Sequence, residues 1–228
     1  IDNYLERKLK SIQRITYNIS VQENTARREN TVLGQDKILD IIAENSVLVH
    51  ERDIISIYNK SGELLFTNYY VDIPSFNKNF HEKISTVKTG FFYDVQIDRN
   101  NRHLISIGMP IFYYADTSMD GYVKQDIDNA DIILLYIDLV GDNREVYIID
   151  DKRVIISSQK PENIGKYLTI KKYSSSQGVL KIKDNNISQV LFYKKIRYLP
   201  WYLIYKIDYS IIKSNSRELI IRVLSRKI

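Results

Sequence analysis

Cysteine is absent from this chain of 228 residues, which excludes a disulfide framework, a thiol nucleophile and a cysteine-based zinc site. Glycine and proline are scarce, at 8 and 4 residues, and no serine-rich, glycine-rich or proline-rich tract marks a flexible linker. No apolar run reaches the roughly 18 residues that a membrane span needs, and no signal-peptide pattern is present. The composition, 44% hydrophobic and 27% charged, is that of one large globular domain or two small ones with a short boundary.

The formal net charge of +5 would suit an anionic partner such as a nucleic acid or a membrane surface. Lysine and arginine are spread along the whole chain, however, and are interleaved with 28 acidic residues. Because a nucleic-acid footprint is a clustered basic stripe, we expect no nucleic-acid partner.

The motifs of the common enzyme classes are also missing, namely the glycine-rich nucleotide loops, the GxSxG nucleophile turn and the HExxH zinc helix. The three histidines, His50, His81 and His103, are isolated from one another and favour surface or interface roles. The aspartates of segment 115–131 could ligate a hard cation, but their spacing does not fit an EF-hand loop. We expect no enzymatic activity in this fragment, no cofactor and no metal, and we interpret 115–131 as a mobile insertion over a pocket.

Amphipathic helices are predicted at both ends of the chain. Near the start, apolar residues recur every three or four positions, at Ile1, Leu5, Leu9, Ile12, Ile15 and Ile19. A second helix is expected before residue 50, and a comparable apolar stripe follows Tyr209. The helical start and the uncapped end suggest a fragment of a larger protein, in which the N-terminal helix forms a homodimer. The alternative is that both are ordinary terminal helices packed on a core.

The middle of the chain contains an internal repeat, in which one sequence unit occurs twice. The stretch IISIYNKSGELLFTN, 54–68, is matched by VYIIDDKRVIISS, 146–158, and a short helix and further strands follow each hairpin in the same order. The turn at Asn100-Asn101 is likewise matched by Asn185-Asn186. The expected strands of the first half are 54–58, 64–69, 91–98, 103–113 and 132–139, and those of the second half are 145–150, 154–158, 179–183, 188–198 and 201–208. The predicted fold class is α+β, with a long N-terminal helix followed by two tandem PAS-like units, each a five-stranded antiparallel sheet with helices.

The chain resembles the double Cache (dCache) extracellular sensor region of bacterial transmembrane receptors, which include sensor histidine kinases, chemoreceptors and diguanylate cyclases. The resemblance rests on VYIIDDKRVIISSQKPENIGKYL, LPWYLIYKID and LISIGMPIFYY and covers almost the full chain. It implies an extracellular or periplasmic location in a membrane-anchored protein, with a histidine kinase as the first choice of host. The implied organisation is an N-terminal helical stalk and second helix at 1–50, a membrane-distal ligand-binding unit at 51–141, a membrane-proximal unit at 142–208, and a helix leading towards a membrane span at 209–228.

The resemblance also implies that a small molecule binds in the distal unit. Amino-acid-binding members carry an Arg, Trp and Tyr around the distal short helix, where this chain has the sequence DIPSF at 72–76, so the arginine that would hold a ligand carboxylate is missing. Asp138 matches the family's aspartate in the last distal strand, and it would accept a hydrogen bond from a ligand amine or hydroxyl. Alternatively, its carboxylate caps the strand end. The candidate ligand-binding residues are Asp138, Tyr93, Tyr113, Tyr136 and Phe76.

The predicted function is therefore an extracytoplasmic sensor for an unidentified small molecule, which passes the signal to the helix that begins near Tyr209. A protein-interaction module that recognises a solute-binding protein or an envelope component, without a small ligand, is the alternative. A thermal-shift screen separates the two, because a bound solute stabilises the native state.

Overall fold

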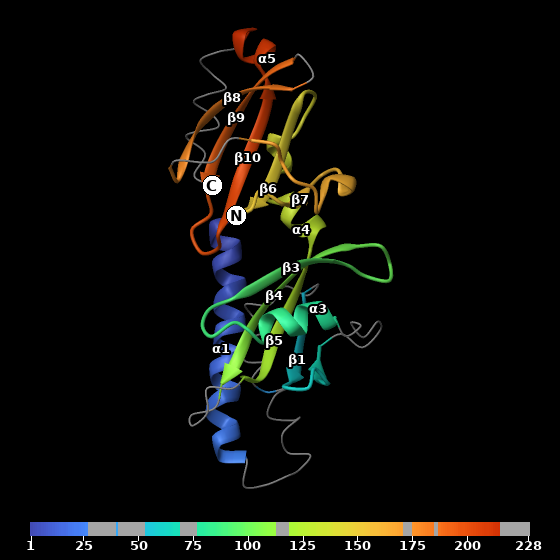
Figure 1. Cartoon of the computed structure of the whole chain (residues 1–228), viewed down its shortest axis with the longest axis vertical. Helices are drawn as coiled ribbons and strands as arrows, with labels where there is room; N and C mark the ends of the chain where they lie inside the picture. The colour runs from blue at the N-terminus through green and yellow to red at the C-terminus, as the bar shows by residue number, and fades with distance from the viewer. Residues whose placement is uncertain are drawn as a thin grey trace. The chain divides into compact units, whose positions relative to one another are not determined.

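The computed structural model describes residues 1–26, 40, 53–68, 77–112, 119–170, 175–184 and 187–214. The chain forms two compact units (Figure 1), an N-terminal unit of Tyr4–Asp128 and a C-terminal unit of Asn129–Ile228 that also includes Ile1–Asn3. Each unit is built on a five-stranded antiparallel sheet, with strand order β2-β1-β5-β4-β3 in the first and β7-β6-β10-β9-β8 in the second. The predicted fold class, a long N-terminal helix and two tandem PAS-like sheets, is confirmed.

The N-terminal unit has helices on both faces of its sheet. Its elements are α1 (Asp2–Ala26), β1 (Ile54–Asn59), β2 (Leu64–Thr67), α3 (Lys78–Ile84), β3 (Phe92–Ile97), β4 (His103–Phe112) and β5 (Met119–Asp128). The β3–β4 turn is the one expected at Asn100-Asn101, and Asn101 adopts a positive φ of 60° there, which asparagine tolerates. The second helix expected before residue 50 lies largely outside the described residues, as do the Asn185-Asn186 turn and the chain beyond residue 214.

Helix α1 uses its apolar stripe inside the chain. Leu5, Leu9, Ile12 and Ile15 are at most 4% exposed. Lys8, on the same side of the helix, is ion-paired with Asp53 just before β1. These four residues belong to the apolar stripe from which we predicted dimerisation, and they are buried by contacts within the chain itself. The exposed positions of the helix include Arg7, Lys10 and Arg14, and Lys10 is ion-paired with Glu6 at 2.7 Å. Dimerisation through this helix stays a prediction.

Helix α3 covers the other face of the same sheet. Asn77 caps it by accepting a hydrogen bond from the backbone N–H of Phe80. Phe80 and Ile84 are buried, and they pack against Tyr58 and Tyr122. Gly108 of β4 permits this close approach, because a Cβ there would lie 2.6 Å from the Ile84 side chain.

The C-terminal unit begins with two short helices, α4 (Asn129–Leu134) and η2 (Ile137–Leu139). Its remaining elements are β6 (Arg144–Asp150), β7 (Ile155–Ser158), η3 (Pro161–Asn163), β8 (Gln177–Asp184), β9 (Ile187–Lys195), β10 (Trp201–Asp208) and α5 (Tyr209–Ser214). Asn129 donates to the Ser158 carbonyl at 3.2 Å, and the Tyr136 hydroxyl bonds Ser157 at 2.9 Å, so α4 and the turn after it are fixed on β7. Among the described residues, no helix is both long and apolar enough to cross a membrane.

The fifth strand of the N-terminal unit is not where the sequence pattern predicted it. Residues 132–139 form α4 and η2, and the strand is β5, inside the segment 115–131 that we interpreted as a mobile insertion. A short apolar run such as IILLYIDL does not distinguish a strand from a helix. The strand β5 was not recognised in the sequence because it contains several polar residues. Lys124, Gln125 and Asp126 are nevertheless buried, each with a hydrogen-bond partner. The boundary between the units accordingly falls after Asp128, and residues 129–141 group with the C-terminal unit.

Candidate ligand-binding sites on the two sheets

The covered face of the N-terminal sheet carries a buried charged cluster. On β5, Lys124 and Asp126 point to the side of α3, and Ser106 of β4 lies directly opposite Asp126. All three residues are at most 3% exposed. The Lys124 ammonium donates to Asp126 Oδ2 at 3.0 Å, and the Ser106 hydroxyl donates to the same carboxylate. The Lys124 ammonium also lies 5.4 Å from the centre of the Phe80 ring.

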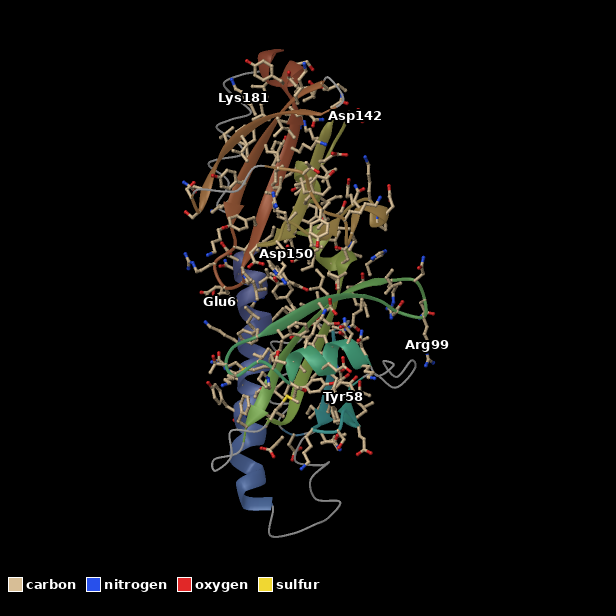
Figure 2. The ribbon with its side chains drawn as sticks, in the orientation of Figure 1. Glu6, Tyr58, Arg99, Asp142, Asp150 and Lys181 are labelled. Atoms are coloured by element: carbon tan, nitrogen blue, oxygen red, sulfur yellow. The ribbon has the colours of Figure 1, made fainter. Side chains whose placement is uncertain are left out.

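Aromatic rings border this cluster. Tyr58 of β1 and Tyr122 of β5 stack with ring centres 4.8 Å apart and planes within 16°, and Phe80 meets Phe92 edge to face at 5.0 Å. Figure 2 shows Tyr58 among the side chains of this region. Burial, with a further contribution from the charge of Asp126, raises the pKa of Tyr58 to about 12. The face therefore places a carboxylate, an ammonium and aromatic rings together in one buried cluster.

The opposite face of β5 is tied to α1. Gln125 alternates with Lys124 and Asp126, and its side-chain amide donates to Asp53 at 2.9 Å, while Asp53 pairs with Lys8 of the helix. A shift of β5 would therefore act directly on α1.

The sequence-predicted site residues do not assemble at this cluster. Tyr93 lies opposite Ile107, in the row of Gln125, and therefore on the face away from Asp126. Asp138 is exposed on η2, so its expected place at the end of a strand was wrong. Tyr136 is 1% exposed in the C-terminal unit, where burial raises its pKa to about 12 despite the opposing hydrogen bond with Ser157.

Phe76 and Tyr113, the other two predicted residues, lie outside the described residues. Sequence reasoning also missed Ser106, Lys124 and Asp126. The signal that could have found the last two is the end of DGYVKQDID, 120–128, which matches the end of WYLIYKID in having Ile-Asp directly before a helix.

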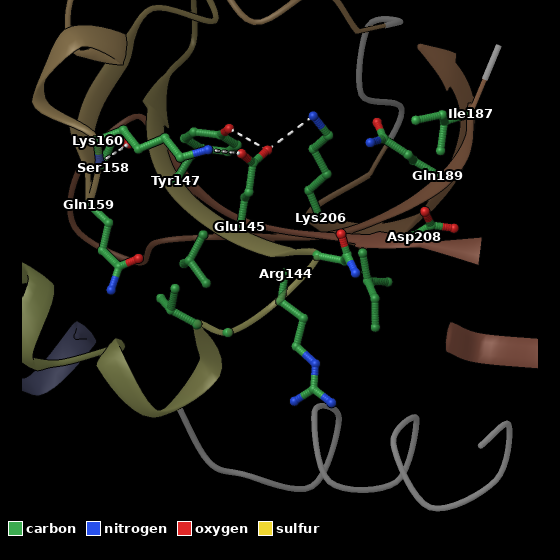
Figure 3. Close-up of a pocket in the computed structure, with 15 residues that line it drawn as sticks. Arg144, Glu145, Tyr147, Ser158, Gln159, Lys160, Ile187, Gln189, Lys206 and Asp208 are labelled. Atoms are coloured by element: carbon green, nitrogen blue, oxygen red, sulfur yellow. Dashed lines mark hydrogen bonds and ion pairs between the residues drawn. The ribbon is translucent and has the colours of Figure 1, made fainter. Parts of the chain in front are cut away.

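The C-terminal sheet carries a cavity of about 320 Å³ (Figure 3). Glu145 of β6 lines it and accepts hydrogen bonds from Lys160 at 2.8 Å and from the Tyr147 hydroxyl at 2.7 Å. Lys206 of β10 forms an ion pair with the same carboxylate at 3.0 Å. Partial burial alone would raise the pKa of Glu145, but these three donors outweigh it and lower the pKa to about 2.

The charged positions of the two sheets correspond through the repeat. Asp126 and Lys206 are each followed by Ile-Asp and then by a helix, α4 or α5. On the adjacent strand, Ile54 of β1 is paired with Asp126, and Glu145 of β6 is paired with Lys206. The repeat thus keeps a charge at one place on both sheets but inverts its sign. Among the described residues, no group of three or more acidic or histidine side chains could hold a metal ion.

This fold, two five-stranded antiparallel sheets behind an N-terminal helix, is that of the dCache-type ligand-binding domains of chemoreceptors. No protein-family model and no curated protein sequence matches the chain.

Several solved structures match the chain over most of its length. The ligand-binding domain of the Pseudomonas fluorescens chemoreceptor CtaA, in complex with L-isoleucine, is 13% identical with a TM-score of 0.68, over 93% of this chain and 88% of that chain. The domain of the amino acid chemoreceptor PctB of Pseudomonas aeruginosa PAO1, in complex with L-Arg, is 12% identical with a TM-score of 0.65, over 92% and 89%. The domain of Campylobacter jejuni Tlp3, in complex with 4-methylisoleucine, is 13% identical with a TM-score of 0.59, over 92% and 85%. At such identities the likeness establishes the fold alone.

Proposed function

We propose that this chain is the extracytoplasmic sensor region of a transmembrane receptor and that it binds a small solute on the α3 face of the N-terminal sheet. The observation that carries the proposal is the buried pair of Lys124 and Asp126, whose side chains are 4% and 1% exposed. The free energy needed to desolvate two buried charges is about as large as the attraction between them, so a buried ion pair adds little to the stability of the fold. Binding a ligand that carries both charges would explain the pair, because the ligand could bond Asp126 and Lys124 in place of their bond to each other.

The solute that fits is an amine that also carries a carboxylate, the class to which amino acids belong. Its ammonium would bond Asp126 beside the rings of Tyr58 and Tyr122, and its carboxylate would bond Lys124 in place of the arginine that this chain lacks. Amino acids are the ligands bound in the CtaA and PctB structures, which favours the same class here.

The test is a thermal-shift and calorimetric screen of the purified chain with the common amino acids, simple amines, sugars and nucleobases. We expect a subset of the amines or amino acids to raise the melting temperature, because a ligand that binds only the native state stabilises it by mass action. Asp126→Asn should abolish the shift, while the matched control Asp138→Asn, at an exposed position in the other unit, should leave it unchanged. No shift with any solute would favour the protein-interaction alternative, and a shift lost in Asp138→Asn but kept in Asp126→Asn would overturn the site.

The proposal for the host receptor is supported by the similar structures and not by the site. The CtaA, PctB and Tlp3 structures are chemoreceptor domains, which favours a chemoreceptor over the histidine kinase that sequence analysis put first. In either host, α5 and the residues after it would lead towards the membrane, and the full-length gene identifies the output domain.

A further inference from the structure

Gln96 of β3 belongs to the same face of the N-terminal sheet as the buried charged cluster. It is paired with Leu104 of β4, two residues along from Ser106, and side chains two apart in a strand lie on the same face. Its Oε1 atom accepts a hydrogen bond from the Lys124 ammonium at 3.3 Å. Gln96 is therefore in direct contact with the cluster, although β3 is an edge strand of the sheet.

The contact with Lys124 fixes the orientation of the Gln96 amide. An ammonium group can only donate hydrogen bonds, so the amide atom that bonds it must be the carbonyl oxygen. The nitrogen, Nε2, is then the other end of the amide. Nε2 is buried, and it has no hydrogen-bond partner among the described residues. The two N–H donors of this nitrogen thus lack an acceptor in the part of the chain that the structure describes.

A buried amide nitrogen without an acceptor lowers the stability of a fold. Such groups are rare in native proteins unless a water or a ligand completes them. A methionine at position 96 would fill nearly the same volume and would bury no amide group. The polar end of Gln96 is therefore useful when an acceptor from outside the chain reaches it.

The acceptor that fits is the carboxylate of an amino acid ligand. The proposed function places this carboxylate on Lys124, and a carboxylate has two oxygens that can accept from two neighbouring donors. Because Oε1 and Nε2 of Gln96 belong to one amide group, and Oε1 lies 3.3 Å from the Lys124 ammonium, the second oxygen of the carboxylate can reach Nε2. Lysine alone is a point charge without the paired donors of an arginine. Gln96 supplies the second donor.

We propose that Gln96 is a specificity-determining residue of the N-terminal site and that, together with Lys124, it holds the ligand's carboxylate through two donors. This role rests on the proposed function and adds that the ligand must carry a carboxylate. The acidic residues of the same face, Asp94 and Asp126, are paired with Ser106 from either side, in the next row of the sheet, where they suit the ligand's ammonium group. The site thus selects an amino acid over the amide of the same amino acid.

The experiment is isothermal titration of the purified chain at neutral pH with L-isoleucine, L-leucine, L-arginine and L-asparagine. The carboxamide of each is titrated beside it, because it has a neutral group in place of the carboxylate. We expect at least one amino acid to bind, and its carboxamide to bind about tenfold more weakly or worse. Gln96→Met should weaken the binding of the amino acid about tenfold, since it removes a hydrogen bond to a charged group. The matched control Gln177→Met, at an exposed glutamine of the C-terminal unit, should bind as the wild type does.

Two further measurements separate binding from a structural role. Gln96→Met should leave the melting temperature of the unliganded chain about unchanged, because the lost bond to Lys124 is offset by the removal of a buried nitrogen without a partner. Gln96→Glu replaces the donor by a carboxylate that repels the carboxylate of the ligand. This variant should lose the preference for the amino acid over its carboxamide.

The role of Gln96 is overturned if an amino acid binds and Gln96→Met binds it as tightly as the wild type does, or if the carboxamide binds as well as the amino acid. A Gln96→Met chain that melts far below the wild type would assign the residue to the fold and would also overturn its role. If amines without a carboxylate bind and no amino acid does, the sensor function stands and the role of Gln96 alone fails. If neither amino acids nor amines bind, the proposed ligand class fails, and the role of Gln96 fails with it.

Discussion

Removing one charge of the Lys124–Asp126 pair should damage the protein far more than removing both. Asp126→Asn keeps an acceptor for the Ser106 hydroxyl but leaves the Lys124 ammonium, whose side chain is 4% exposed, without a counter-charge. In the double variant Lys124→Met/Asp126→Asn, a side chain of similar length replaces the ammonium and no buried charge remains. Neither change alters the backbone or the packing volume by much.

The expected magnitudes follow from the burial of the pair. An uncompensated buried charge typically costs about 3–5 kcal/mol, whereas replacing a whole buried pair with neutral groups is often neutral or stabilising. For a chain of this size, about 1 kcal/mol shifts the melting temperature by roughly 2–4 °C. Taking the lower cost of about 3 kcal/mol, we expect Asp126→Asn to melt roughly 6–12 °C below the wild type. The double variant should lie within a few degrees of the wild type.

Urea unfolding followed by circular dichroism, beside a thermal melt, measures both effects. Neither variant should bind the solute found by screening, so the double variant would separate the ligand's requirement for the two charges from the requirement of the fold. Equal losses of stability in the single and the double variant would refute the reasoning, as would a single variant that is as stable as the wild type.

Three other substitutions test particular contacts. Glu145→Gln should make the free energy of unfolding depend less on pH in the acid range. The pKa of Glu145 in the folded protein is about 2, below the ordinary value of 4.5. The wild-type carboxylate therefore stabilises the fold above pH 4.5 and loses that contribution as the pH falls towards 2. Solvent screening at this part-exposed site limits the effect to the order of 1 kcal/mol, and a parallel pH profile for both proteins would count against the network. Gly108→Ala should cost about 1–3 kcal/mol in urea unfolding, because its Cβ would meet Ile84 at 2.6 Å and Phe80 at 2.8 Å; an unchanged midpoint would show that α3 moves freely. Asn77→Ala should cost about 1 kcal/mol by removing the cap of α3, and Asn77→Ser should recover most of it if capping is the cause.

Most of the fold was accessible from the sequence because hairpins and turns are local. The β1–β2 and β6–β7 hairpins and the positive-φ turn at Asn101 all stand close to where the apolar runs and turn residues placed them. The fifth strand of the first unit was misplaced because β5 pairs with β1 and β4, and its polar residues are buried only in that context. The expected place of Asp138 changed with the strand, because Asp138 lies on η2 and the residues at the end of β5 are Ile127 and Asp128.

The sequence by itself therefore determined the repeat, the fold class and the elements whose contacts lie close along the chain. Only the tertiary structure decided which face of β5 meets α3, that Lys124 and Asp126 are a buried pair, and that Glu145 lies between two lysines. These facts depend on register between strands distant in sequence, where a shift of one residue moves every side chain to the other face of the sheet. The local periodicity of the sequence does not specify that register, and the proposed chemistry of both candidate sites depends on it.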